Sequence, residues 1–326
     1  MPEDAARSGP NGVRSPTASV FSGTAVLRRL LGIGGLFSRS GGVALPSIVV
    51  AAFIGASAGS MIRHNRELVL EDHWRSTNSM GIVLVEQTSR YVQVIDMMLR
   101  EVQNGISNSQ VTTPTEFQDR FGGEEFQSSL ADRLRAAPQV DAIFLIDSNG
   151  IIFNWSHDGP VPRIDSSDRD YYKYFKEHQD AGLFIGSIWK ARVTGQVSLH
   201  FARRVTGPDG TFLGVVLGNV NSKYLSDFYQ SAAEGLGESI ALLRHDGTML
   251  MRYPSPELAI GMKLPQVSLW YNSVAEGGGS YINDAATTGV PSVLTVRLLP
   301  DYPLVITILK DKAVVFAQWQ RRRSIL

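Results

Sequence analysis

One apolar segment, residues 43–62, constrains the fold of this chain more than any other feature. Its 20 residues contain no charged side chain, and Arg39 and Arg63 flank it. An α-helix rises about 1.5 Å per residue, so the segment would be ~30 Å long, which matches the hydrocarbon core of a bilayer. We therefore expect a transmembrane helix that anchors the rest of the chain.

Two other interpretations of this segment remain open, a cleaved signal peptide and a buried core helix. A signal peptide usually has a shorter apolar core close to the N-terminus and a small-x-small cleavage site. Ala56, Ser57 and Ala58 supply such a site, but 42 residues rich in Gly, Ser and Arg precede the apolar run. An uncleaved span fits this arrangement best.

The charges around the segment predict its orientation. Five arginines precede it against two acidic residues: Arg7, Arg14, Arg28, Arg29 and Arg39 against Glu3 and Asp4. Positive charge is retained in the cytoplasm, so residues 1–42 should be a cytoplasmic tail, and their composition predicts disorder. Arg63 and Arg66 weaken the asymmetry, although acidic residues follow them at once. Residues after about 62 should therefore face outward.

Composition excludes several function classes. Over the whole chain of 326 residues, lysine and arginine balance aspartate and glutamate at 31 each, and no long basic stripe occurs, which argues against a nucleic-acid partner. The chain has no cysteine, so disulfides, thiolate metal sites and cysteine nucleophiles are excluded. The hydrophobic content of 43% is enough to build the cores of two small domains.

A long helix should follow the span. Apolar residues recur at helical spacing over residues 67–102 without a proline, which predicts a stalk of roughly 40 residues within 63–111. Its apolar stripe could pack on the domain, on a second copy of the chain, or on both. A second helix is expected over residues 116–135, before Pro138.

Two segments then repeat one pattern. Residues 141–155 and 239–253 each hold an apolar run, a turn that ends in Gly150 or Gly247, and a return run that closes on Trp155 or Tyr253. This is a hairpin signal, and its recurrence predicts two related units in tandem. Two unrelated hairpins could also look alike.

Each hairpin precedes one helical segment and further strand-like runs. The first unit, 112–233, would hold a helix at 168–178, strands at 183–189, 196–205 and 211–220, and a connecting helix at 223–233. The second, 234–312, would hold a helix at 266–275 and strands at 279–282, 292–298 and 304–309, before a basic segment at 313–326. The predicted class is α+β, with two antiparallel sheets that carry helices.

Several motifs in this order resemble the double Cache (dCache) family, a tandem of PAS-like sheets behind a long membrane-proximal helix. They are Asp168-Arg-Asp-Tyr-Tyr172, Phe184-Ile-Gly186, Ala202-Arg-Arg204, Gly210-Thr-Phe-Leu-Gly-Val-Val216, Leu242-Leu-Arg-His-Asp-Gly-Thr-Met-Leu250 and Arg252-Tyr-Pro254. The resemblance covers residues 63–312. It is greatest to the extracytoplasmic sensor domains of bacterial receptors on diguanylate cyclases and histidine kinases.

The resemblance implies a sensor that binds a small molecule in its membrane-distal sheet and signals through the long helix. It implies a cytoplasmic output partner outside this chain. Together with the apolar span and the apolar stripe of the stalk, it predicts a single-pass protein of the bacterial inner membrane with a periplasmic sensor domain, and a homodimer. No cofactor, metal or catalytic residue is expected. The expected ligand-binding residues are Trp155, Arg169, Tyr171, Tyr172, Trp189, Arg203 and Asn219. The aromatic residues would enclose a solute, and Arg169 or Arg203 would pair with a carboxylate.

One departure from the family bears on the ligand. Family members that bind α-amino acids resemble this chain at Arg169, Tyr171 and Tyr172, but they also carry two aspartates that hold the ligand's ammonium. Those positions fall here on Ala191 and Asn219. A buried ammonium without a counter-charge is costly, so an organic acid or another anionic or neutral solute is expected instead.

The alternatives belong to other function classes. None of the six histidines forms a His-x-x-x-His pair, and no nucleophile elbow, phosphate-binding loop or dinucleotide fingerprint occurs. A hydrolase with a dispersed triad would leave no such trace. A ligand-independent dimerisation or docking module is the main rival to the sensor. Relatives would begin a second transmembrane helix near Trp319, so the chain is either a truncated sensor or a stand-alone anchored binding protein.

Overall fold

The computed structural model describes residues 44–179, 182–190, 192, 195, 197–233, 237–254, 261–284 and 289–323. The expected cytoplasmic tail, residues 1–42, lies outside them. The chain divides into two units, Met1–Arg63 and His64–Leu326. The first unit contains the start of helix α2 (Ala44–Ser107), and among the described residues this is the one helix long and apolar enough to cross a membrane.

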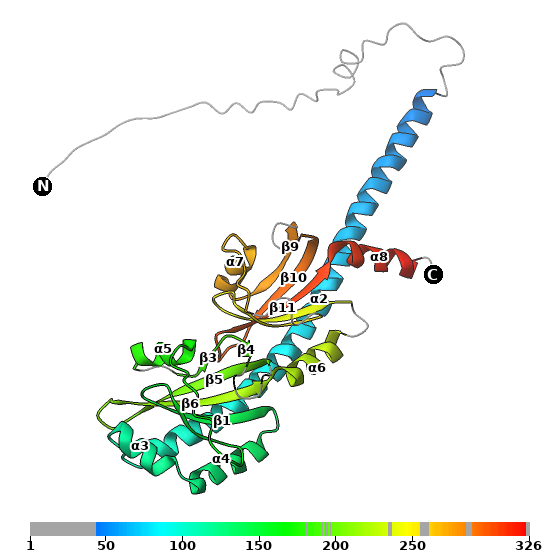
Figure 1. The fold of residues 1–326 in the computed structure, drawn as a ribbon. Coiled ribbons are helices and arrows are strands. Elements are labelled where there is room, and N and C mark those ends of the chain that lie inside the picture. The colour runs from blue at the N-terminus through cyan, green and yellow to red at the C-terminus, as the bar shows by residue number, and fades with distance from the viewer. Residues whose placement is uncertain are drawn as a thin grey trace, which may run out of the picture. The chain divides into compact units, whose positions relative to one another are not determined.

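The second unit contains two antiparallel sheets (Figure 1). The strands of the first are β1 (Val140–Asp147), β2 (Ile152–Trp155), β3 (Phe184–Ile185), β4 (Trp189–Lys190), β5 (Val197–Thr206) and β6 (Phe212–Asn221). Those of the second are β7 (Ser239–Arg244), β8 (Met249–Tyr253), β9 (Gly279–Asp284), β10 (Pro291–Leu298) and β11 (Leu304–Asp311). We call residues 114–233 the first subdomain and residues 239–311 the second subdomain.

The two sheets have equivalent topology. The strand order is β2-β1-β6-β5-β3 in the first, with β4 also on β5, and β8-β7-β11-β10-β9 in the second. The two hairpin turns also match, because Gly150 and Gly247 have φ of +90° and +82° and donate to Asp147 and Arg244. A side chain would strain this backbone conformation, which explains glycine at both positions. The predicted α+β class with two tandem PAS-like units is confirmed.

Helix α2 covers one face of both sheets. Its buried apolar residues, including Leu84, Ile95 and Leu99, share one core with the inward-facing residues of the two sheets. Thr77 meets Thr295 of the second sheet at 2.8 Å between hydroxyl oxygens, and Gln103 donates to the carbonyl of Arg204 in the first. The helix therefore contacts both subdomains.

The remaining helices are shorter. They are α3 (Pro114–Phe121), α4 (Glu124–Ala136), α5 (Asp170–Glu177), α6 (Ser222–Ala233), α7 (Leu269–Ala275) and α8 (Lys312–Arg323). The single helix predicted over 116–135 is wrong: it breaks into α3 and α4 at Gly122 and Gly123, because paired glycines are poor in a helix interior and favourable at its ends. The strand predicted over 183–189 likewise divides into β3 and β4, at Gly186.

Candidate ligand-binding site

The first sheet is covered on the face away from α2 by helix α5. Tyr171, Tyr172 and Phe175 of this helix are buried and form a core with alternate residues of β1, β5 and β6. Strand side chains alternate between faces, so each strand gives one set of residues to α2 and the other to α5. The candidate site lies on the α5 face.

Four of the predicted residues are aromatic, and three of them pack on this face. Trp155 at the end of β2 stacks on Phe144 with ring centroids 6.2 Å apart. The hydroxyl of Tyr172 donates to the carbonyl of Ser148 at 2.6 Å, and the ring of Tyr171 stacks on that of His200 at 6.3 Å. These contacts fix the aromatic rings as rigid walls.

Arg169 and Trp189 lie together, as a pair. The Arg169 guanidinium lies 5.4 Å from the centroid of the Trp189 ring, a cation–π contact, and Trp189 is 44% exposed. Arg169 precedes the first turn of α5. Among the described residues no carboxylate pairs with its guanidinium, so the group can bind an anion at the margin of the site.

Two buried polar atoms on this face have no hydrogen-bond partner among the described residues. They are Oδ1 of Asn219, a residue only 5% exposed, and Nε1 of Trp155. Asn219 lies between Ala142 of β1 and His200 of β5 in the strand register. A buried acceptor without a hydrogen-bond donor lowers the stability of the folded protein by about 1–3 kcal/mol. Such an atom is typical of a site where a bound ligand supplies the missing donor.

The structure places Arg203 on the other face, which corrects its assignment to the site. In β5 the side chains of Phe201 and Arg203 face α2, whereas Ala202 faces α5. Arg203 is 8% exposed, and its Nε donates to Oδ1 of Asp96 on α2 at 2.7 Å. Its guanidinium is therefore engaged with the helix, and Arg203 does not join the other six residues.

The sequence analysis missed His200, which lies on the α5 face beside Asn219. Burial lowers the pKa of His200 to about 4, so the imidazole is neutral near pH 7. Its Nδ1 lies 3.4 Å from the carbonyl oxygen of Ser187. Side chains alternate between the two faces of a strand, so His200 shares the face of Ala202, two residues further along β5. That alternation is the signal that could have identified it.

Asp170, at the start of α5, is an acidic residue beside this cluster. Its two carboxylate oxygens accept the backbone N–H groups of Tyr171, at 2.9 Å, and Ser187, at 3.1 Å. Asp168 pairs with Arg192, with 2.7 Å between nitrogen and oxygen. Both carboxylates are thus occupied. Ala191, Thr194 and the side chain of Lys190 lie outside the described residues, so the comparison with amino-acid-binding relatives rests on Asn219.

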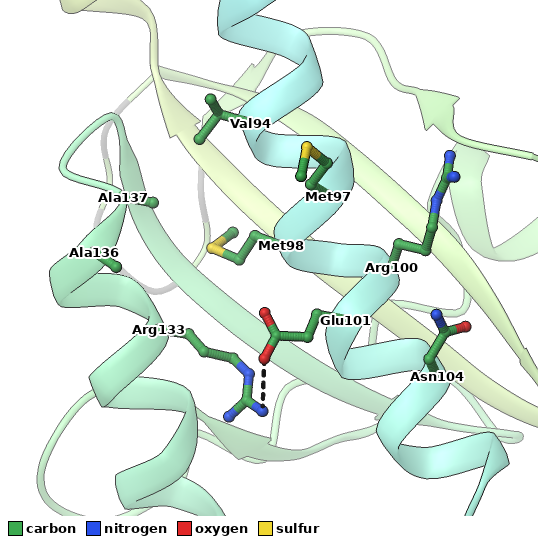
Figure 2. Close-up of a pocket in the computed structure, with 9 residues that line it drawn as sticks. All are labelled: Val94, Met97, Met98, Arg100, Glu101, Asn104, Arg133, Ala136 and Ala137. Carbon is green, nitrogen blue, oxygen red and sulfur yellow. Dashed lines mark ion pairs between the residues drawn. The ribbon is translucent and has the colours of Figure 1, made fainter.

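No group of three or more acidic or histidine side chains that could hold a metal occurs among the described residues. A separate cavity of about 530 Å³ lies between α2 and α4 (Figure 2). Arg133 of α4 pairs there with Glu101 of α2 at 3.3 Å, and the exposed side chains of Val94 and Met97 border it. None of the predicted site residues lines this groove, so it is distinct from the candidate site.

Comparison with known proteins identifies the type of domain. Residues 222–309 match the dCache_1-like family model, described as a histidine kinase sensor domain. No curated protein matches the chain.

Solved structures match over most of the chain. The extracellular domain assigned to the histidine kinase rpHK1S-Z16 is 27% identical with a TM-score of 0.61, over 76% of this chain and 97% of that one. The periplasmic sensory domain of the Campylobacter jejuni chemoreceptor Tlp1 is 14% identical with a TM-score of 0.59, over 76% and 98%. The ligand-binding domain of the Pseudomonas fluorescens chemoreceptor CtaA is 17% identical with a TM-score of 0.54, over 78% and 98%. At these identities the two chemoreceptors share the fold alone.

The homologous domains are extracellular sensor domains, and the chain adds to such a domain one helix that could span a membrane. The family match, the strand order of the two sheets and the similarity to rpHK1S-Z16 lead to one conclusion: this chain has the tandem PAS-like fold of double Cache domains, and its residues 222–309 match the histidine kinase sensor domain of that family.

Proposed function

We propose that this protein is a membrane-anchored sensor that binds a small neutral or anionic metabolite under α5 in the first subdomain. The observation that carries the proposal is the unpartnered, buried Oδ1 of Asn219 on the face that α5 covers. Trp155 offers an unpartnered indole N–H on the same face. An acceptor and a donor on a face with aromatic walls are the kind of polar groups that fix a ligand in a mostly apolar pocket.

The charges favour a ligand without an ammonium group. Arg169 is the cation at the margin, and the carboxylate of Asp170 already accepts two backbone N–H groups. Asn219 carries no charge to balance an ammonium, and desolvating an unpaired cation is costly. The neighbouring structure of CtaA was solved with L-isoleucine, so an amino acid is the rival outcome that the experiment must distinguish.

We further propose that the sensor domain is periplasmic, that α2 crosses the bacterial inner membrane once, and that the chain itself is not an enzyme. The ligand would shift an existing equilibrium between two packings of α2, which a cytoplasmic partner reads. Arg203 supports this route, because its ion pair with Asp96 joins β5 directly to α2.

The test is a thermal-shift screen of the full-length chain in detergent against organic acids, amino acids, polyamines, sugars and purines. A ligand at one hundred times its dissociation constant adds about 2.7 kcal/mol of stability. We expect organic acids or neutral solutes to stabilise the protein, and Arg169→Ala and Asn219→Leu to weaken that response. A response to amino acids would overturn the ligand class, and substitutions without effect would overturn the site.

A second function, a dimerisation module, is favoured by a different observation. Val83, Val94 and Met97 of α2 are 57%, 44% and 61% exposed and recur at spacings that bring them to one side of the helix. We propose that a second copy of the chain covers this surface. If no ligand class shifts the melting temperature while the protein still dimerises, the chain is a dimerisation module that binds no solute.

A further inference from the structure

The second subdomain has a cavity of its own, of about 360 Å³, between its sheet and the segment that contains α7. Figure 1 shows α7 beside β9 and β10, on the second sheet. Because the strand orders of the two sheets correspond, α7 lies on the second sheet as α5 lies on the first. None of the candidate-site residues of the first subdomain lines it, so this cavity needs an explanation of its own.

The strand register explains why a cavity forms. Ala241 of β7 lies between Arg252 of β8 and Thr307 of β11, so the floor of the cavity is a methyl group. Trp270 of α7 is 1% exposed, and its Nε1 donates to the hydroxyl of Thr307 at 2.9 Å. That bond fixes the indole near the sheet. The apolar walls include Leu243, Met249 and Leu294.

Arg252 is held so that part of its guanidinium remains available. Its Nε donates to the hydroxyl of Ser239 at 3.1 Å, and this hydroxyl donates to the carbonyl of Tyr253 at 2.9 Å. Neither terminal nitrogen of Arg252 has a partner among the described residues. Two parallel N–H groups bind a carboxylate bidentately, with both specificity and strength.

The charged side chains that line the cavity are both cationic. Arg252 and Lys263 are its charged lining residues, and none of the described residues that line it is acidic. Lys263 lies 3.8 Å from Asp246, so Arg252 is the main cation. A volume of about 360 Å³ is near the lower end of ligand pockets, which suits a compact molecule.

We propose that this second cavity binds a small carboxylate with an apolar body, its carboxylate on Arg252 and its body between Ala241 and Trp270. The site is separate from the one under α5, because none of the residues that line it belongs to that site. A sensor with two such sites would respond to two metabolites through the one helix that contacts both sheets.

The experiment measures the binding of phenylacetate to the full-length chain in nanodiscs by isothermal titration calorimetry. Phenylacetamide, which has the same body without the charge, is the matched control ligand. We expect phenylacetate to bind and Arg252→Met to weaken it by about 10- to 100-fold, the usual contribution of a charge-assisted pair. Phenylacetamide should bind as weakly to the wild type as phenylacetate does to Arg252→Met.

Two further variants decide where the probe binds. Ala241→Leu fills the floor of the cavity and leaves Arg252 in place, so it should abolish binding even if Arg252→Met folds poorly. Asn219→Leu alters only the site under α5 and should leave phenylacetate binding unchanged. Loss of binding in Asn219→Leu, full binding in Ala241→Leu, or no binding of phenylacetate to the wild type would each overturn the proposal without bearing on the first site.

Discussion

Arg203 of β5 donates from Nε to Oδ1 of Asp96 on α2 at 2.7 Å, and the two residues are 8% and 5% exposed. Residues 107 positions apart in the chain thus form a buried ion pair between the first sheet and the long helix. Arg100 binds the other oxygen of Asp96 at 2.9 Å, so the carboxylate has two guanidinium partners. We expect movement of β5 to be transmitted to α2 through this pair.

Removing Asp96 should therefore destabilise the protein strongly. In Asp96→Leu the guanidinium of Arg203 stays buried with Gln103, at 3.4 Å, as its remaining side-chain partner among the described residues. Removing one partner of a buried ion pair costs about 3–5 kcal/mol. We expect a loss of this size in the free energy of unfolding, measured by urea denaturation. The double variant Asp96→Leu/Arg203→Met should recover much of the loss. The matched control is Arg90→Ala, whose exposed pair with Glu86 should contribute under about 1 kcal/mol. Equal losses in both would refute the coupling.

Replacing Asn219 should separate stability from binding. Its Oδ1 is buried without a partner, so Asn219→Leu should leave the ligand-free protein as stable or raise its unfolding free energy by about 1–3 kcal/mol. Asn154 is the matched control, because its amide donates to the carbonyl of Phe121 at 2.6 Å and accepts from the N–H of Trp155 at 2.7 Å. Asn154→Leu should instead lower the free energy of unfolding by about 1–3 kcal/mol, because it removes these two hydrogen bonds. A destabilised Asn219→Leu would argue against a ligand acceptor.

His200 should make stability depend on pH. Burial lowers its pKa from 6.5 to about 4, so the folded state binds the proton more weakly than the unfolded state does. The free energy of unfolding therefore has its full value, as far as His200 is concerned, above about pH 6.5. It decreases as the pH falls through 6.5 toward 4 and below, by up to about 3 kcal/mol in total. Subtracting the unfolding profile of His200→Gln from that of the wild type should isolate this step. A slope in His200→Gln identical to that of the wild type would contradict the assignment.

The exposed side of α2 should mediate dimerisation. Met97→Asp places a charge among Val83, Val94 and the apolar surface of a second copy, and should raise the dimer dissociation constant at least about tenfold. Analytical ultracentrifugation of the full-length chain in detergent measures this constant. Met262→Asp is the matched control, because Met262 is 62% exposed in the second subdomain, away from α2. Equal effects of the two substitutions would point to nonspecific association.

The sequence by itself determined the order and type of most elements and the tandem repeat. The paired turns at Gly150 and Gly247 and the alternating apolar runs around them are local signals, because turn geometry and side-chain period act over a few residues. The apolar span and the helical spacing behind it were likewise readable, and the single helix expected over 116–135 failed only where two glycines break it. Six of the seven expected site residues lie on or beside the α5 face.

Only the tertiary structure decided which residues share a face and which polar groups are paired. Arg203 and Arg204 are neighbours of the same type, and the sheet register alone sends the first to Asp96 on α2 and the second to the α5 side. The unpartnered oxygen of Asn219, the neutral His200 and the cavity over Ala241 also depend on contacts between segments far apart in the chain. Desolvation and hydrogen-bond satisfaction are properties of the packed state, and no local pattern encodes them.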